Sequence, residues 1–154
     1  MTTETEVRTQ DEFDAAIQRG DKAICVSGSF AMTAGRGQVD LLAGTRLDVS
    51  GSGCATVRAA GRATVHASGC ATVHASGSAT VYAADSATVR AWGDATVHAS
   101  GRVFVRVFSA LKITASAHVV IMLHGAAKSV EGGQQIAVYD GKRIEAASVP
   151  GGAA

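Results

Sequence analysis

Along the middle of the chain, apolar residues alternate with polar ones within a longer period of eight. From residue 53 to residue 124 the sequence divides without a gap into the octads GCATVRAA, GRATVHAS, GCATVHAS, GSATVYAA, DSATVRAW, GDATVHAS, GRVFVRVF, SALKITAS and AHVVIMLH. The same phase extends backwards through Leu47, Val49 and Gly51 and, one octad earlier, through Val39, Leu41 and Ala43. Such regular self-similarity is typical of repeat architectures.

Period-2 alternation inside each octad predicts short strands joined by tight turns. The glycine in nearly every octad and the central Thr-Val pair both oppose a continuous helix, and an octad does not match two helical turns. We expect the Ala, Val and Ala of each octad to point inward, the Thr and the residue after Val to point outward, and Ser-Gly to make the corner. The fold class predicted is all-β.

Strands this short with such short connections are suited to a parallel β-solenoid, or β-roll, in which each octad is one side of a coil. Two octads give a flattened 16-residue coil, and three give a triangular 24-residue coil. The hydrophobic fraction is 47%, but 30 Ala and 18 Val supply most of it, against 5 Leu and 6 Ile. Because such small side chains would leave a triangular lumen empty, we favour the 16-residue coil with a thin core.

The two ends of the chain carry different patterns, which divide it into residues 1–22, 23–124 and 125–154. Thr9 and Glu12 form the sequence signature of a capping box. They precede a short helix that should end at Gly20 and cover the first coil, with an apolar face made of Phe13, Ala16 and Ile17. At the other end, residues 135–139 and 143–147 resemble a hairpin that closes the last strand edge, followed by a flexible tail.

Charge and cysteine content exclude several classes of protein. The chain has 14 basic and 13 acidic residues, and this net charge of +1 argues against a nucleic-acid binder. It has neither a secretory signal nor an apolar run that could span a membrane, so we expect a cytoplasmic protein, although carriage in a phage particle or export without a signal stays open. Cys54 and Cys70 occupy the same position in octads two apart, so the 16-residue coil stacks them within disulfide range, whereas a 24-residue coil separates them. In the cytosol we expect both thiols to be reduced.

The runs at residues 77–83 and 85–91 follow the pattern Gly/Asp-Ser-Ala-Thr-Val-x-Ala, and this pattern resembles octapeptide-repeat proteins of bacteria and bacteriophages. The resemblance is close over residues 53–101 and extends to the flanks by phase alone. It implies a β-solenoid and carries no catalytic or binding residues. The octad lacks the Gly-Gly-x-Gly-x-Asp signature of calcium-binding β-rolls and the hexapeptide period of acyltransferase solenoids.

The outward positions should form ladders along the solenoid. One face should carry Thr56, Thr72 and Thr88, and the opposite face Thr64, Thr80 and Thr96. Threonine rows suggest ice binding or polysaccharide binding, but each strand offers one threonine beside a bulky Arg, His or Tyr, so we take the rows as solvated ladders. His66 and His98 lie two coils apart, roughly 9.6 Å by the strand spacing, which is too far for one metal ion. We expect no metal site and no cofactor.

The outward residues cease to be polar near the C-terminal end of the repeat. Stacking every second octad collects five of them on one face, namely Trp92, Phe104, Phe108, Val120 and Met122. A contiguous apolar patch marks an interface or a surface covered by the chain's own C-terminal segment. We therefore predict a non-enzymatic structural module that self-associates, as a homodimer, through this face. The alternatives are a filament-forming scaffold like the bactofilins and an ice- or polysaccharide-binding surface; we expect neither a nucleic-acid partner nor a small-molecule substrate.

Overall fold

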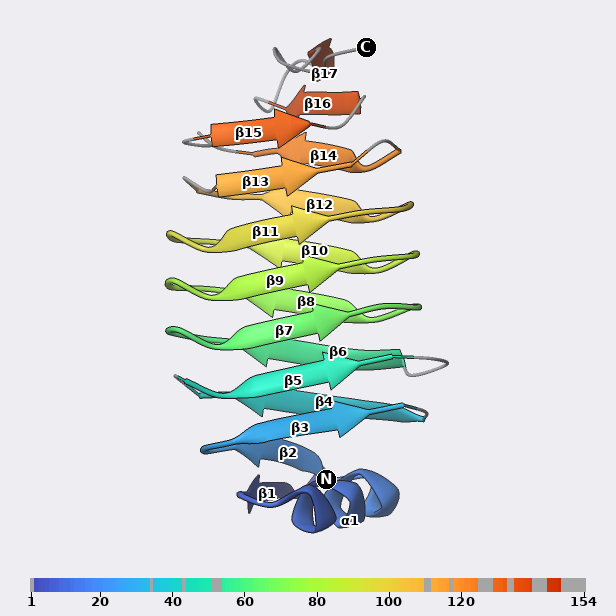
Figure 1. Cartoon of the computed structure of the whole chain (residues 1–154), viewed down its shortest axis with the longest axis vertical. Helices are drawn as coiled ribbons and strands as arrows, with labels where there is room; N and C mark the ends of the chain where they lie inside the picture. Colours follow the sequence, from blue (N-terminus) through green and yellow to red (C-terminus); the bar gives the residue numbers. More distant parts are fainter. Residues whose placement is uncertain are drawn as a thin grey trace.

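The computed structural model describes residues 2–33, 35–42, 44–50, 54–109, 112–116, 118–124, 129–132, 135–139 and 144–147. From β2 to β16, successive strands alternate between two sheets, so the chain winds upward as a parallel β-solenoid (Figure 1). One sheet consists of ten strands: β1 (Glu4–Val7), β2 (Lys22–Cys25), β4 (Arg36–Leu41), β6 (Cys54–Ala59), β8 (Thr72–Ala75), β10 (Thr88–Ala91), β12 (Phe104–Val107), β14 (Val120–Leu123), β16 (Gln135–Tyr139) and β17 (Ile144–Ala147). The other consists of seven: β3 (Ser29–Met32), β5 (Arg46–Val49), β7 (Thr64–Ala67), β9 (Thr80–Ala83), β11 (Thr96–Ala99), β13 (Lys112–Ala115) and β15 (Ser129–Gly132).

The strand register confirms the 16-residue coil. In the ten-stranded sheet Val57 pairs with Val73, Val73 with Val89, and Val89 with Val105, each in parallel and two octads further along the chain. Two sheets with one octad each make one coil, so the triangular three-octad alternative is wrong. Alternation is also as predicted: in β8 and β10, as in most repeat strands, burial switches between partly exposed and buried at every residue.

The earlier coils keep the predicted alternation but not the predicted register. Val39 pairs with Val57 and Leu47 pairs with Val65, in both cases two positions further along the chain than two octads would give. The two additional residues lie between β5 and β6, before the first regular octad. An insertion of two leaves every side chain on the same face of its strand, which is why the hydrophobic pattern did not reveal it. Gly51, which was assigned an inward position there, lies outside the described residues.

The core is a narrow column of small side chains between the two sheets. In the central coils it consists of Ala and Val, as at Ala79, Val81 and Ala83, all at most 2% exposed. The N-terminal coils instead bury larger side chains, including Phe30, Leu41 and Leu47.

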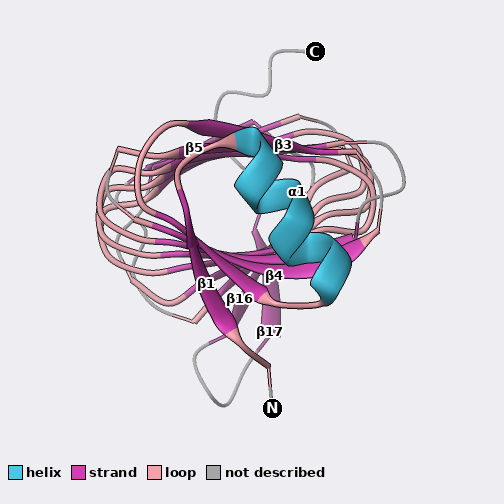
Figure 2. Ribbon diagram, turned by 90° about the horizontal axis from the view of Figure 1, so that it is seen from below, coloured by secondary structure: helices cyan, strands magenta, loops and turns pink. Residues whose placement is uncertain are grey.

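The predicted helix caps the N-terminal end of the solenoid. Helix α1 (Gln10–Arg19) starts with the capping box: Thr9 Oγ1 accepts a hydrogen bond from the backbone N–H of Glu12, and the Glu12 carboxylate accepts one from that of Thr9. It ends at Gly20, which adopts a left-handed conformation with φ of 79°. Viewed along the solenoid axis, α1 lies across the first coil (Figure 2), and the rings of Phe13 and Phe30 are 5.4 Å apart.

Two features at this end were not predicted from the sequence. Strand β1 precedes α1 and pairs in parallel with β2, so it forms the edge of the ten-stranded sheet and carries Glu4 and Glu6. At the edge of the seven-stranded sheet, the Gln10 amide accepts a hydrogen bond from Ala31 N and donates one to Ala31 O, each at 2.9 Å. Gln10 thus occupies a place that another strand could take, and charged side chains on β1 disfavour pairing there.

The octad phase fails after residue 124, as predicted, although strands continue to stack. Between paired positions, the coil from β14 to β16 is one residue shorter than a regular coil, and that from β13 to β15 is one residue longer. Strands β16 and β17 pair antiparallel, which confirms the two arms of the predicted hairpin. The turn between them, with Arg143, and the tail lie outside the described residues.

Candidate functional site

Both predicted threonine ladders form. Thr56, Thr72 and Thr88 are in register on the ten-stranded sheet, and Thr64, Thr80 and Thr96 are in register on the seven-stranded sheet. Each row runs beside a row of bulky side chains, so neither sheet presents a flat surface of hydroxyl and methyl groups. This arrangement favours the solvated-ladder interpretation over ice binding.

The five apolar residues predicted as an interface lie together on three neighbouring strands of the ten-stranded sheet or at their ends. Phe104 of β12 pairs with Val120 of β14, and Arg106, two positions after Phe104, pairs with Met122. Trp92 and Phe108 directly follow β10 and β12, and their rings stack with centroids 4.9 Å apart. Phe108 is 36% exposed, and the other four residues are half-buried. We call these five residues the aromatic face.

The aromatic rings continue in a stack that the sequence did not reveal. His124 stacks on Phe108 at 4.9 Å between centroids, and His74 lies 6.0 Å from Trp92 at the other end. His124 follows Phe108 by two octads, as Phe108 follows Trp92, so this spacing was a usable signal for these three rings. His74 does not share that spacing with Trp92, so the octad phase did not predict its place in the stack.

A row of basic side chains on the same sheet runs between Phe104 and Val120 on one side and the rings of Trp92 and Phe108 on the other. Arg58, His74, Arg90 and Arg106 occupy equivalent positions on successive strands. Burial lowers the pKa of His74, and the positive charges of Arg90 and then Arg58 lower it further, because they disfavour a third cation. Near neutral pH the arginines of this row are therefore charged, whereas the His74 imidazole is neutral.

The N-terminal part of the same sheet carries paired charges of both signs. Lys22 Nζ lies 2.7 Å from a carboxylate oxygen of Asp40 and 2.9 Å from one of Glu4. Hydrogen bonds to Asp40 and then Glu4 raise the pKa of Lys22. Glu6 on β1 pairs with Arg8, and Arg36 is exposed on β4, so acidic and basic groups balance at this end of the sheet.

The seven-stranded sheet carries a second ring stack and a groove beside it. Tyr82 stacks between His66 and His98, with centroids 4.6 Å and 4.8 Å away. Tyr82 thus lies between the two histidines, as the 16-residue coil predicted. The groove beside the rings has a volume of about 620 Å³ and runs past five strands, from β5 to β13.

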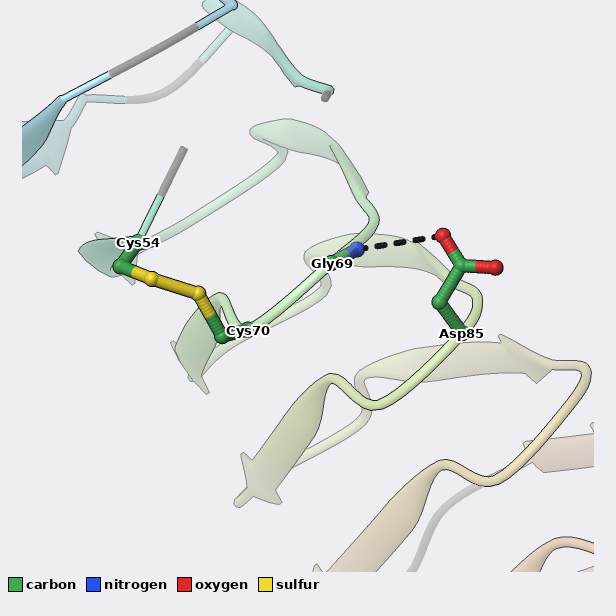
Figure 3. The surroundings of a disulfide bond; sticks show 4 residues. All are labelled: Cys54, Gly69, Cys70 and Asp85. Carbon is green, nitrogen blue, oxygen red and sulfur yellow. Dashed lines mark hydrogen bonds between the residues drawn. A yellow bond between two sulfur atoms is a disulfide. The ribbon is translucent and has the colours of Figure 1, made fainter. Parts of the chain in front are cut away.

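Cys54 and Cys70 form a disulfide between adjacent coils, with Cα atoms 5.0 Å apart (Figure 3). The predicted stacking is confirmed, but the expectation of reduced thiols is wrong in this structure. In the same corner, the Asp85 carboxylate accepts a hydrogen bond from Gly69 N at 3.2 Å. Asp85 has a φ of 59° at a position where Gly69 and Gly101 occupy the neighbouring coils, and its hydrogen bond offsets the strain of that conformation.

The third cysteine, Cys25, has different chemistry. Its thiol is buried in the core, and burial raises its pKa to about 12, with Asp40 adding to the effect. Such a thiol is a poor nucleophile because its thiolate form is scarce at neutral pH. Among the described residues, no group of three or more His, Cys, Asp or Glu side chains could hold a metal ion. No helix in the described part of the chain is long and apolar enough to cross a membrane.

Comparison with known proteins adds no assignment. The chain matches no protein-family model, no curated protein and no solved structure. The geometry above is therefore the basis for any function.

Proposed function

We propose that this protein is a non-enzymatic structural module, a rigid solenoid that forms a homodimer through its aromatic face. The observation that carries the proposal is the gathering of Trp92, Phe104, Phe108, Val120 and Met122 on β10, β12 and β14 or at their ends. Elsewhere on this sheet the equivalent outward positions are mainly polar. Burying these apolar side chains against a second copy removes them from water, and interfaces are enriched in aromatic residues and in arginine, such as the Arg106 that lies between Phe104 and Phe108.

Sedimentation equilibrium tests the dimer. The expected mass of the wild-type protein is twice the 15.5 kDa of one chain, and Phe108→Lys should reduce it to that of a monomer because a lysine cannot be buried without a partner. Tyr82→Lys is the matched control, since Tyr82 is 43% exposed on the opposite sheet and should leave the dimer intact. A monomeric wild type, or a Phe108→Lys variant that keeps the wild-type mass, would contradict the proposal.

The filament-forming alternative requires free strand edges at the ends of the solenoid. Gln10 binds both backbone groups of Ala31, and α1 lies over the first coil, which supports a closed N-terminal end. The polysaccharide-binding alternative would use exposed ring faces, but the faces of Tyr82 and Trp92 are occupied by neighbouring rings. Fibres of the intact chain in electron micrographs would favour the filament.

Origin and location belong to the same proposal. The Gly/Asp-Ser-Ala-Thr-Val-x-Ala octads support a place among bacterial or bacteriophage octapeptide-repeat proteins. A cytoplasmic location was expected from the sequence, but the Cys54–Cys70 disulfide favours an oxidising environment, such as the surface of a phage particle.

A further inference from the structure

The groove on the seven-stranded sheet is a long channel of nearly constant composition. Three rows of residues from successive coils line it: a wall that includes the rings of His66, Tyr82 and His98, a floor made mainly of alanines, and a corner row of serines with Ala84 in its middle. Five strands at the usual spacing give it a length of roughly 19 Å. It runs parallel to the solenoid axis, and small residues leave it open throughout.

The ten-stranded sheet has an equivalent channel, and there the chain itself fills the channel with aromatic rings. The backbone is the same in both places: Ala84 N donates to Ala67 O at 2.8 Å, and Trp92 N donates to Ala75 O at 2.9 Å, so both corner residues bind the end of the preceding coil's strand. A smaller open section of about 310 Å³ remains beside Ser76, and Trp92 lines it too. The two channels differ at this corner position and in the wall beside it, where the ten-stranded sheet carries the basic row and the seven-stranded sheet the His66, Tyr82 and His98 rings.

The stacked rings show what cross-section such a channel accepts. Trp92, Phe108 and His124 follow one another at 4.9 Å between centroids, with planes within 8° of parallel, so one ring of each coil fits across the channel. The open channel has the same corner backbone, but its corner residues are Ser or Ala. A molecule about as wide as one ring and several coils long would fill it.

The wall of the open channel indicates the chemistry of that molecule. The faces of the His66, Tyr82 and His98 rings lie against each other, so the rings present their edges to the groove. Ring edges are the positive part of the aromatic quadrupole and favour contact with the face of another π-system. The alanines of the floor, Ala67, Ala83 and Ala99, are at most 4% exposed, so the ring edges and the small corner residues supply most of the contact surface.

We propose that this groove binds an elongated, planar aromatic or conjugated molecule that lies parallel to the solenoid axis. The site is on the sheet opposite the aromatic face, so it is independent of the proposed dimer. A sugar chain fits less well, because sugars stack on exposed ring faces and the groove offers ring edges.

Binding of the planar dye thioflavin T tests this proposal. With the purified wild-type protein, dye fluorescence should rise and saturate at one dye per chain. Ala84→Trp places an indole where Trp92 stands on the other sheet and should weaken binding by about tenfold or more, because it fills the middle of the groove. Ser76→Trp is the matched control at the same corner of the ten-stranded sheet and should bind as the wild type does.

Two further measurements separate the possible outcomes. Phe108→Lys should bind the dye as the wild type does, even if this variant is a monomer. The dimer proposal and the groove proposal can therefore fail independently of each other. Absence of a fluorescence increase in the wild type, or equal binding by Ala84→Trp, would overturn the proposed site. A loss of mass in Ala84→Trp, measured by sedimentation without dye, would show that a second copy occupies the groove and would also overturn it.

Discussion

The coils at the N-terminal end and those in the middle of the solenoid bury apolar surface in different ways. A central coil lies between two nearly identical coils, so Ala and Val ladders fill the narrow space and no large residue is needed. At the N-terminal end, β3 is the edge of its sheet and has a neighbouring strand on one side only. There Phe30 packs against Phe13 of α1, and in the next coil Leu41 and Leu47 enlarge the core. Repetition therefore stabilises the middle of a solenoid, whereas its end depends on a few large side chains.

The corners between strands also differ between the N-terminal and the central coils. A Cβ atom added to Gly77 would lie 3.1 Å from the backbone of Gly61 in the preceding coil, whereas one added to Gly44 would meet nothing within 4 Å. Both Gly77 and Gly44 have positive φ. Regular coils stack their corners in close contact, and the irregular N-terminal coils leave theirs open.

The largest effect should come from the end of the solenoid. Phe13→Ala should lower the free energy of unfolding by about 3–5 kcal/mol, because it empties the contact between α1 and the first coil. Val89→Ala, in a central ladder, should cost about 2 kcal/mol, since it removes two methyl groups. Denaturant titration measures both values. Equal losses in the two variants would show that the end coils are packed no differently from the central ones.

The disulfide lies at the junction between the two regions, directly after the two additional residues. Replacing both Cys54 and Cys70 by Ser should cost about 3 kcal/mol, the value expected for a loop of this length. Reducing agent should destabilise the wild type by a similar amount and leave the double variant unchanged. A wild-type protein insensitive to reductant would indicate that these coils are held by strand pairing alone.

The smallest expected effect distinguishes the two kinds of corner. Gly44→Ala should cost about 1 kcal/mol, the penalty for an L-residue in the left-handed region. Gly77→Ala should cost about 2 kcal/mol, because its methyl group also presses on the preceding corner. Gly77→Asn should recover part of that loss, as the Asp85 side chain does by binding Gly69 N. Identical melting temperatures for the two alanine variants would contradict close stacking of the central corners.

Much of the architecture was predictable because its signals are local. Alternation in each octad predicted which side chains are buried, and Thr9, Glu12 and Gly20 predicted both ends of α1. The pairing of β1 with β2 and the Gln10 contact with Ala31 were missed. Both contacts join segments that come together only when the chain folds, and no sequence pattern predicts either contact.

The candidate sites were predictable to different extents. Stacking every second octad placed the five residues of the aromatic face on neighbouring strands or at their ends, as the pairing has them, because they belong to regular coils. The interface itself stays a prediction. The groove on the opposite sheet was not predicted. It exists because Ser68, Ala84 and Ser100 have small side chains at the corner position of their coils. Only the comparison with Trp92, at the equivalent corner of the other sheet, shows that this position can hold an aromatic ring.

The sequence by itself determined that short strands would alternate inward and outward residues, that two octads would make a coil and that a helix would cap the first one. These properties follow from hydrophobic burial and backbone sterics within a few residues. Tertiary structure decided the longer register of the early coils, the stacking of the rings, the closure of the N-terminal edges and the position of the groove. The reason is that an insertion of two residues preserves the alternation, and that contacts between coils depend on which positions the register brings together.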